Sequence, residues 1–171
     1  MTGATPPGDA DVPLVDDIAG LRRILTRSHT IAVVGLSANW YRPSFFAAKY
    51  MRDHGYGIIP VNPAYEDVMG ERCFPDLRTA REITATAIDI VDCFRKSADI
   101  PPIARDAVAI GAKVLWMQLG IENPDARRKA EAAGLEVVEN HCVKIEHARL
   151  FGGLGWAGVN TKVISAKRPT A

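Results

Sequence analysis

The sequence predicts an α/β fold in which a doubly wound parallel sheet of about five strands carries helices on both faces. Five short apolar runs alternate with helical stretches, so that the unit strand–loop–helix repeats four times along the chain. The runs are continuous rather than alternating, as expected of strands that are buried on both faces of a parallel sheet. The chain has 171 residues and shows no internal repeat, which suits a single domain with a full core.

The elements expected in the first half of the chain are, in order, a disordered tail (1–13), a helix from Asp16, a strand (30–36), a helix (44–54) and a second strand (57–62). The tail is rich in Gly, Pro and Asp. The first strand, TIAVVGL, is rich in β-branched residues, and the helix after it stops at Gly55. Asn62 and Pro63 end the second strand with a turn signal.

The elements expected in the second half are a loop with one short strand (68–77), a short helical stretch (79–83), a strand (87–94), a helical stretch (97–111), a strand (112–120), a helix (124–134) and a strand (135–140). Pro124 and Gly134 mark the two ends of the last helix. Residues 14–150 therefore form the predicted domain. Residues 151–171 form a glycine-rich C-terminal extension whose apolar stretch VNTKVIS is a candidate extended segment.

Composition and charge narrow the class of protein. Apolar residues make up 47% of the chain, and 21 basic against 20 acidic residues leave a net charge of +1. This balance provides no strong field toward nucleic acid or a membrane surface, and no apolar run reaches the roughly 20 residues of a membrane span. The N-terminus has no secretory signal pattern, and Cys73, Cys93 and Cys142 are far apart. We therefore expect a cytoplasmic protein with reduced thiols.

The loop after the first strand, GLSANWYRPS (35–44), predicts an anion-binding site. Gly35 permits a sharp turn, Ser37 and Asn39 are small and polar, and Pro43 fits the first position of a helix. A helix start presents free N–H groups and a positive dipole end, and Arg42 lies beside it as a possible phosphate ligand. The alternative is an ordinary strand-to-helix turn.

A nicotinamide or flavin dinucleotide is a poorer match to this loop. The dinucleotide fingerprint needs two further glycines and an acidic residue at the end of the second strand, where this chain has Asn62. A P-loop is excluded because the sequence has no G-x-x-x-x-G-K-[ST]. The third strand ends at Arg95, Lys96 and Ser97, and the fourth at Gln118. These groups predict a cleft for a phosphorylated ligand with a largely uncharged tail.

Five segments, VVGLS…RPS, PVNP, DIVDCFR, GAKVLWMQLGI and HCVKIEH, resemble the small coenzyme A-binding proteins. These are single Rossmann-like domains similar to the N-terminal domain of the succinyl-CoA synthetase alpha subunit, and the resemblance covers about residues 20–150. It implies that the ligand is coenzyme A or an acyl-CoA. The positions that it assigns are the diphosphate near Gly35, Ser37, Arg42 and Ser44, the adenosine end near Val61, Asn62 and Pro63, and the remaining cleft along Arg95, Lys96 and Gln118.

The same resemblance bears on activity. The synthetase uses a phosphohistidine from a separate domain, for which this sequence has no counterpart, so we expect a coenzyme A-binding protein without ligase activity. An enzyme that acts on an acyl-CoA or another nucleotide-type cofactor is the alternative. The sequence leaves open whether the chain forms a homo-oligomer.

One dense cluster near the end of the predicted domain has several interpretations: His141, Cys142, Lys144, Glu146 and His147. A structural zinc site needs about four ligands, and the cluster offers three. A cysteine nucleophile needs a base held by a third group. The favoured interpretation is a small half-buried cysteine next to surface charges at Lys144 and Glu146. A reversible mixed disulfide between Cys142 and the ligand thiol is a further possibility.

Three aromatic residues are candidates to stack on an adenine ring, namely Trp40, Tyr41 and Trp116. Aromatic residues more often serve packing. Trp40 and Tyr41 are the better candidates because they lie in the loop.

Overall fold

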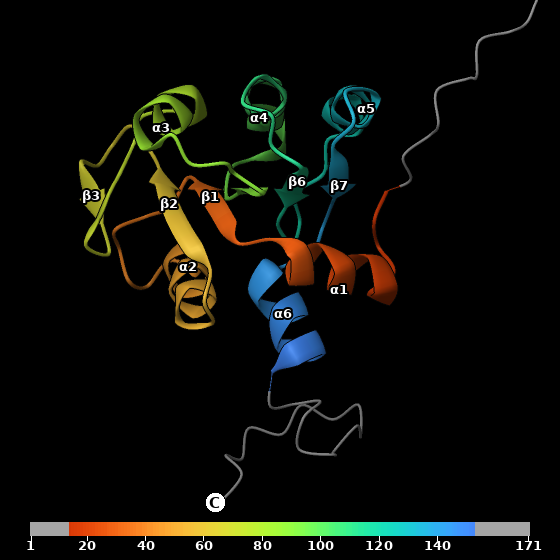
Figure 1. Cartoon of the computed structure of the whole chain (residues 1–171), viewed down its shortest axis with the longest axis horizontal. Coiled ribbons are helices and arrows are strands. Elements are labelled where there is room, and N and C mark those ends of the chain that lie inside the picture. Colours follow the sequence, from red (N-terminus) through yellow and green to blue (C-terminus); the bar gives the residue numbers. More distant parts are fainter. Residues whose placement is uncertain (1–13, 153–171) are drawn as a thin grey trace, which may run out of the picture.

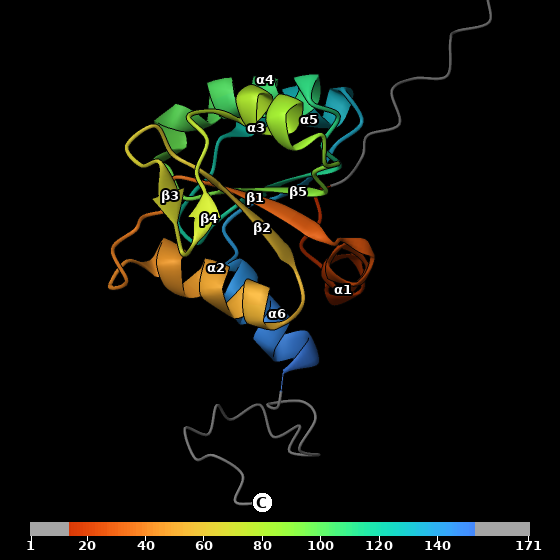
Figure 2. The ribbon, with the colours of Figure 1, turned by 60° about the vertical axis from the view of Figure 1, so that its left-hand side comes forward.

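A five-stranded parallel sheet lies between two layers of helices in the computed structural model, which describes residues 14–152 (Figures 1 and 2). The strands of this sheet are β1 (Thr30–Val34), β2 (Gly57–Val61), β5 (Ile90–Cys93), β6 (Val114–Met117) and β7 (Glu136–Val138). Their order across the sheet is β2-β1-β5-β6-β7. The predicted Rossmann-like sheet of five strands is confirmed. The predictions of a disordered tail at 1–13 and of an extended segment within 153–171 concern residues outside the described range.

Three helices cover each face of the sheet. One face carries α1 (Ile18–Arg27), α2 (Pro43–Asp53) and α6 (Val143–Phe151), and the other carries α3 (Leu77–Thr84), α4 (Ile100–Ala109) and α5 (Pro124–Ala132). A short 3-10 turn at Ser97–Asp99 leads into α4. None of the helices within residues 14–152 has the length and the apolar character that a membrane crossing requires.

Local signals explain where several helices begin. Pro43 and Pro124 occupy the first turns of α2 and α5, where the missing N–H is not needed. The Asp76 carboxylate accepts the backbone N–H of Thr79 at 2.7 Å and caps α3, so that this helix starts at Leu77, before the stretch that the sequence predicts.

The core consists of two apolar layers, one on each face of the sheet. Along β5, Ile90 packs into the layer beneath α1, α2 and α6, whereas Val91 and Cys93 pack into the layer beneath α3, α4 and α5. All four residues of β5 are buried. Burial on both faces explains why the strands read as continuous apolar runs.

Two segments differ from the sequence-based expectation. The region 68–77 contains an antiparallel hairpin of β3 (Asp67–Val68) and β4 (Glu71–Arg72) rather than one short strand. The strand expected at 87–94 begins only at Ile90. Just before it, the Asp89 carboxylate accepts the backbone N–H groups of His29 at 2.8 Å and Thr30 at 3.1 Å.

The connections place a switch point in the middle of the sheet. From β1 the chain passes to β2 on one side, and it then crosses to β5 on the other side of β1. Open α/β sheets bind ligands beyond the carboxyl ends of the strands at such a point. Gly35, after β1, and Phe94 and Arg95, after β5, lie at this position.

Candidate functional site

A cavity of about 1030 Å³ opens at the carboxyl edge of the sheet. Its walls come from the β1–α2 loop, the start of α2, the ends of β5 and β6, and the first turn of α6. Seven of the ten residues that the sequence assigns to a ligand line this cavity: Gly35, Ser37, Arg42, Ser44, Arg95, Lys96 and Gln118. Segments far apart in the sequence thus meet at one place.

Gly35 occupies a position that a larger residue would disturb. Its φ of +87° lies in the left-handed region, which favours glycine. A Cβ atom there would lie 2.5 Å from the carbonyl oxygen of Phe94 and 3.2 Å from Nε of Arg95. The absence of a side chain lets the ends of β1 and β5 approach closely and lets the Arg95 side chain lie against the turn.

The small polar residues of the β1–α2 loop hold the loop together. The Ser37 N–H donates to Oγ of Ser44 at 3.1 Å, and the Asn39 N–H donates to Oγ of Ser37 at 3.0 Å. The Tyr41 N–H donates to Oδ1 of Asn39 at 3.0 Å. Arg42 is the N-cap residue of α2 and makes no side-chain cap bond. The loop is therefore braced internally, and the guanidinium of Arg42 remains exposed beside the helix start.

Four cationic side chains line the cavity: Arg42, Arg95, Lys96 and Lys144. None of them forms an ion pair with a carboxylate within residues 14–152. One acidic residue, Asp99, also lines the cavity. The electrostatic environment therefore favours an anion, and the arginines offer the planar donor geometry that suits phosphate.

A second cavity of about 350 Å³ lies next to the first and shares Arg95 and Asp99 with it. Val61 and Pro63 line this second cavity. Asn62 lines neither cavity. Its Nδ2 donates to the carbonyl of Leu36 at 3.1 Å, and its Oδ1 accepts the N–H of Ala64 at 2.9 Å. The side chain of Asn62 thus ties the end of β2 to the end of β1.

Gln118 connects the floor of the cavity to α6. Its Nε2 donates to Oδ1 of Asp92, and its Oε1 accepts the N–H of Val143 at 3.3 Å. Complete burial raises the pKa of Asp92 to about 7, although the hydrogen bond from Gln118 acts in the opposite direction. Sequence reasoning missed Asp92, although a carboxylate inside an apolar run is a visible signal.

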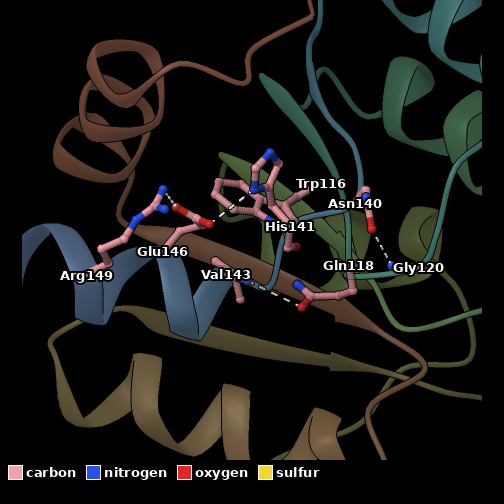
Figure 3. Close-up of polar contacts among 8 residues, drawn as sticks. All are labelled: Trp116, Gln118, Gly120, Asn140, His141, Val143, Glu146 and Arg149. Carbon is pink, nitrogen blue, oxygen red and sulfur yellow. Dashed lines mark hydrogen bonds and ion pairs between the residues drawn. The ribbon is translucent and has the colours of Figure 1, made fainter. Parts of the chain in front are cut away.

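A network of hydrogen bonds fixes the segment that leads into α6 (Figure 3). Trp116 Nε1 donates to the carbonyl of His141 at 2.8 Å, and the N–H of Gly120 donates to Oδ1 of Asn140 at 2.7 Å. His141 Nδ1 lies 3.1 Å from Oε1 of Glu146. The first turn of α6 is therefore held at the ends of β6 and β7.

The interpretation of Glu146 as a surface charge is wrong. Glu146 is only 5% exposed, and its carboxylate contacts both His141 and Arg149. The Glu146 side chain reaches from α6 back to His141 in the segment before the helix, as Figure 3 shows. Cys142, by contrast, is half-buried and lines the larger cavity.

The two histidines of this cluster face different surroundings. His147 is buried, and its Nδ1 lies 3.1 Å from the hydroxyl of Tyr50 on α2, whereas His141 pairs with Glu146. Burial, with a smaller contribution from nearby His54, lowers the pKa of His147. Across residues 14–152, no three His, Cys, Asp or Glu side chains are grouped so that they could hold a metal ion.

The three aromatic residues proposed to stack on adenine differ in their exposure. Trp116 is fully buried, so its ring serves packing and its Nε1–H holds the His141 carbonyl. Trp40 and Tyr41 are exposed, with ring centroids 3.7 Å apart, and Tyr41 lines the larger cavity. Stacking of either ring on an adenine stays a prediction.

Sequence reasoning also missed the apolar part of the larger cavity. Phe46 on α2, Leu119 after β6 and Ile145 on α6 line it, although each is exposed. An apolar residue in a helix or loop carries no signal that separates a cavity wall from an ordinary surface position.

The sheet order and the cavity at its switch point define a Rossmann-like α/β domain. The CoA binding domain family matches residues 29–148, well over half of the chain, and the chain belongs to this family. The uncharacterized protein YneT of Bacillus subtilis is 39% identical over 130 residues, which are 76% of this chain and 93% of that protein.

Solved structures agree with this assignment. A hypothetical protein from Pyrococcus horikoshii OT3 superposes with a TM-score of 0.75 at 38% identity, over 88% of this chain and 100% of that one. The dinucleotide-forming acetyl-coenzyme A synthetase 1 of Ca. Korarchaeum cryptofilum has a TM-score of 0.56 at 20% identity. That match covers 68% of this chain and 27% of the synthetase, and it shows a shared fold.

Proposed function

We propose that the protein binds coenzyme A or an acyl-CoA at the carboxyl edge of the sheet and has no ligase activity of its own. The diphosphate lies at the start of α2, near Gly35, Ser37, Arg42 and Ser44. The adenosine end extends toward the second cavity at Val61 and Pro63, with Asn62 shaping the turn beneath it. The pantetheine arm follows the larger cavity past Lys96 toward Gln118 and α6.

The observation that supports this most strongly is the set of unpaired cations at the switch point. Arg42 and Arg95 both line the larger cavity, and neither pairs with a carboxylate in residues 14–152. Phosphate groups attract such donors, and the start of α2 adds a positive dipole end. Arg95 lines both cavities, so it is placed to contact a ligand that extends across them.

The site argues against a nicotinamide dinucleotide. Such a cofactor is held by an acidic residue at the end of the second strand. That position is Asn62 here, and both ends of its amide are engaged by Leu36 and Ala64. The family assignment and the geometry therefore favour the same ligand.

The test is thermal unfolding of the purified protein with coenzyme A and, separately, with NAD. At a coenzyme A concentration of about 100 times the dissociation constant, the free energy of unfolding should rise by about 2.7 kcal/mol. NAD at the same concentration should leave it unchanged. Native mass spectrometry of the protein as purified gives an independent check, because a bound mass equal to coenzyme A identifies the ligand directly. Equal stabilisation by NAD would remove the basis of the proposal.

A further inference from the structure

Exposed apolar side chains gather at one cavity. In the part of the chain that the structure describes, nine large apolar residues are exposed. Four of them line the larger cavity: Tyr41, Phe46, Leu119 and Ile145. Single exposed apolar residues are normal on a protein surface, but a group around one cavity indicates an apolar ligand or partner.

Two groups of residues line the cavity: a cationic part at Arg42 and Arg95, and an apolar part at Leu119 and Ile145, beside which Lys144 adds a further cation. Arg42 and Arg95 lie at the turn after β1 and at the end of β5. Leu119 follows β6, and Ile145 lies on the first turn of α6, so both belong to the side of the cavity next to Gln118. A ligand with a phosphate group at one end would place its other end against these apolar residues.

The apolar part is held in place before any ligand arrives. The Val143 N–H bonds to Gln118 at 3.3 Å, and the Gly120 N–H bonds to Asn140 at 2.7 Å, so Leu119 and Ile145 are carried by segments that are tied together (Figure 3). A preorganised apolar surface binds an apolar group without the cost of ordering itself. Leu119 is nevertheless 67% exposed and Ile145 53% exposed, so a large part of this surface is still in contact with water.

Lys144, which precedes Ile145 in the chain and also lines the cavity, contacts two aromatic rings. Nζ of Lys144 lies 5.8 Å from the ring centroid of Phe46 and 5.9 Å from that of Tyr50. Both distances fall within the range of a cation–π interaction. Lys144 thus contributes aromatic contacts as well as positive charge to the cavity.

We infer that the preferred ligand is a coenzyme A thioester with an apolar acyl chain, and that Phe46, Leu119 and Ile145 receive this chain. The inference rests on the proposed function, because the phosphate end of the ligand must occupy the cationic part of the cavity. Free coenzyme A would leave the apolar side chains in water. An acyl chain of several carbons would cover them, and the affinity would rise with its length.

Isothermal titration calorimetry of the full chain with coenzyme A, acetyl-CoA, butyryl-CoA and hexanoyl-CoA tests the inference. Each added methylene should tighten binding by roughly two- to fourfold, the upper value corresponding to about 0.8 kcal/mol for a fully buried methylene. Equal affinity for all the thioesters and for coenzyme A would overturn the inference while leaving the proposed function intact. Failure of every compound to bind would instead refute the proposed function.

Two variants test whether Leu119 and Ile145 produce the dependence of affinity on acyl-chain length. Leu119→Ser and Ile145→Ser should each lower the ratio of hexanoyl-CoA affinity to coenzyme A affinity by several-fold. Both residues are exposed, so the variants should unfold at the same temperature as the parent protein. Ile83→Ser is the matched control, since Ile83 is exposed on α3 and lines neither cavity. It should leave the ratio unchanged.

A second copy of the chain is the competing occupant of this apolar surface. Analytical sedimentation of the ligand-free protein tests whether the chain forms a dimer through it. A monomer whose chain-length dependence disappears in both serine variants supports the inference. A dimer that dissociates in the same two variants, with no chain-length dependence in the parent protein, would show that this surface is an interface and would overturn the inference.

Discussion

The two ends of the sheet differ in whether their charged side chains form ion pairs within the protein. At the amino end, Glu136 at the start of β7 pairs with Arg23 and Arg27 of α1. Asp89, just before β5, accepts two backbone N–H groups from the start of β1 and pairs with Lys113 at 3.2 Å. Charges at this end are matched within the protein and hold neighbouring elements together.

At the carboxyl end, the cations around the cavity have no such partners in residues 14–152. Arg42, Arg95 and Lys96 make no ion pair there. The carboxylates that do form pairs near this end have other partners: Glu146 pairs with His141 and Arg149, and Glu139, just after β7, pairs with Arg127 of α5. The charges at the amino end are paired within the chain, whereas the cations around the cavity are not. The difference separates an end of the sheet that is held by ion pairs from the end at which we propose that the ligand binds.

Two aspartates three residues apart in the chain, Asp89 and Asp92, show the same contrast. Burial raises the pKa of Asp89, but the N–H groups of His29 and Thr30 and the ammonium of Lys113 outweigh it, so the net pKa is lowered. Asp92 is buried and accepts a hydrogen bond from the amide of Gln118, and burial raises its pKa to about 7. The protein stabilises the ionised form of Asp89 at the amino end of β5, whereas burial disfavours the ionised form of Asp92 within β5.

The largest expected effect comes from Gly35, where the two strand ends meet. Gly35→Ala should lower the free energy of unfolding by roughly 2–5 kcal/mol, because a left-handed φ costs an alanine about 1–2 kcal/mol and overpacking about 1–3 kcal/mol. Gly111→Ala is the matched control at the other end of the sheet, with a φ of +72° and no atom within 4 Å of an added Cβ. It should show the backbone cost alone. Equal losses in urea unfolding would contradict the close approach of β1 and β5.

The second effect is a pH dependence set by Asp92. Its pKa is raised from 3.8 in the unfolded chain to about 7 in the folded protein, so its contribution to stability is complete below pH 3.8 and is lost as the pH rises through 7. Asp92→Asn removes this loss. Relative to the parent protein, the variant should gain up to about 4 kcal/mol between pH 4 and pH 8, at roughly 1.36 kcal/mol for each pKa unit.

Asp89→Asn should change the pH dependence of stability in the direction opposite to Asp92→Asn. Because the pKa of Asp89 is lowered in the folded protein, ionised Asp89 stabilises the fold above its unfolded pKa, and this contribution is lost as the pH falls. The free energy of unfolding of Asp89→Asn should therefore fall furthest below that of the parent protein at neutral pH. Urea titrations across the pH range would measure both variants. Parallel profiles for the parent protein and Asp92→Asn would show that Asp92 is ionised in the folded state.

The third effect is on ligand affinity. Arg42→Ala and Arg95→Ala should each weaken coenzyme A binding by roughly 1.5–3 kcal/mol, the range for hydrogen bonds to charged groups. Arg105→Ala, on the exposed side of α4 and outside both cavities, should change nothing. Calorimetry with dephospho-coenzyme A would show which arginine contacts the 3′-phosphate, because the loss from that variant should then disappear. Unchanged affinity in both variants would make them ordinary surface charges.

The smallest effect is chemical and leaves stability unchanged. Coenzyme A disulfide should react with Cys142, whose thiolate attacks one sulfur, forms the mixed disulfide and releases coenzyme A as a thiolate. Burial raises the pKa of the Cys73 and Cys93 thiols, so they serve as internal controls. Mass spectrometry should show one adduct that a reductant removes. An adduct that persists in Cys142→Ser would assign the reaction to another thiol.

Much of the fold could be predicted from the sequence because buried parallel strands leave a strong local pattern. The runs around Ile31, Ile58, Val91, Leu115 and Val137 are apolar on both faces, and each of them is a strand. The β3–β4 hairpin was missed because strands of two residues are too short to show a period. The start of β5 was missed because the Asp89 side chain takes the hydrogen bonds of the β1 start.

The candidate site was predictable only in part. Glycine, arginine and the helix start lie next to one another in the sequence, so Gly35 and Arg42 could be placed at one turn. The burial of Glu146 and the apolar wall at Phe46 and Ile145 depend on how α2 and α6 pack together, and no local pattern reports that contact. Asn62 appeared as a ligand candidate, but its amide bonds to the neighbouring loop.

Because α6 is the last helix of the domain, its position determines when the cavity is completed during synthesis of the chain. Residues near 35 and 95 leave the ribosome long before Lys144 and Ile145, yet all of them line one cavity. A partly made chain can bring β1 and β5 together but lacks a wall of the cavity until α6 has emerged and docked on Gln118. A ligand that contacts α6 therefore binds the finished fold and stabilises that state over every shorter intermediate.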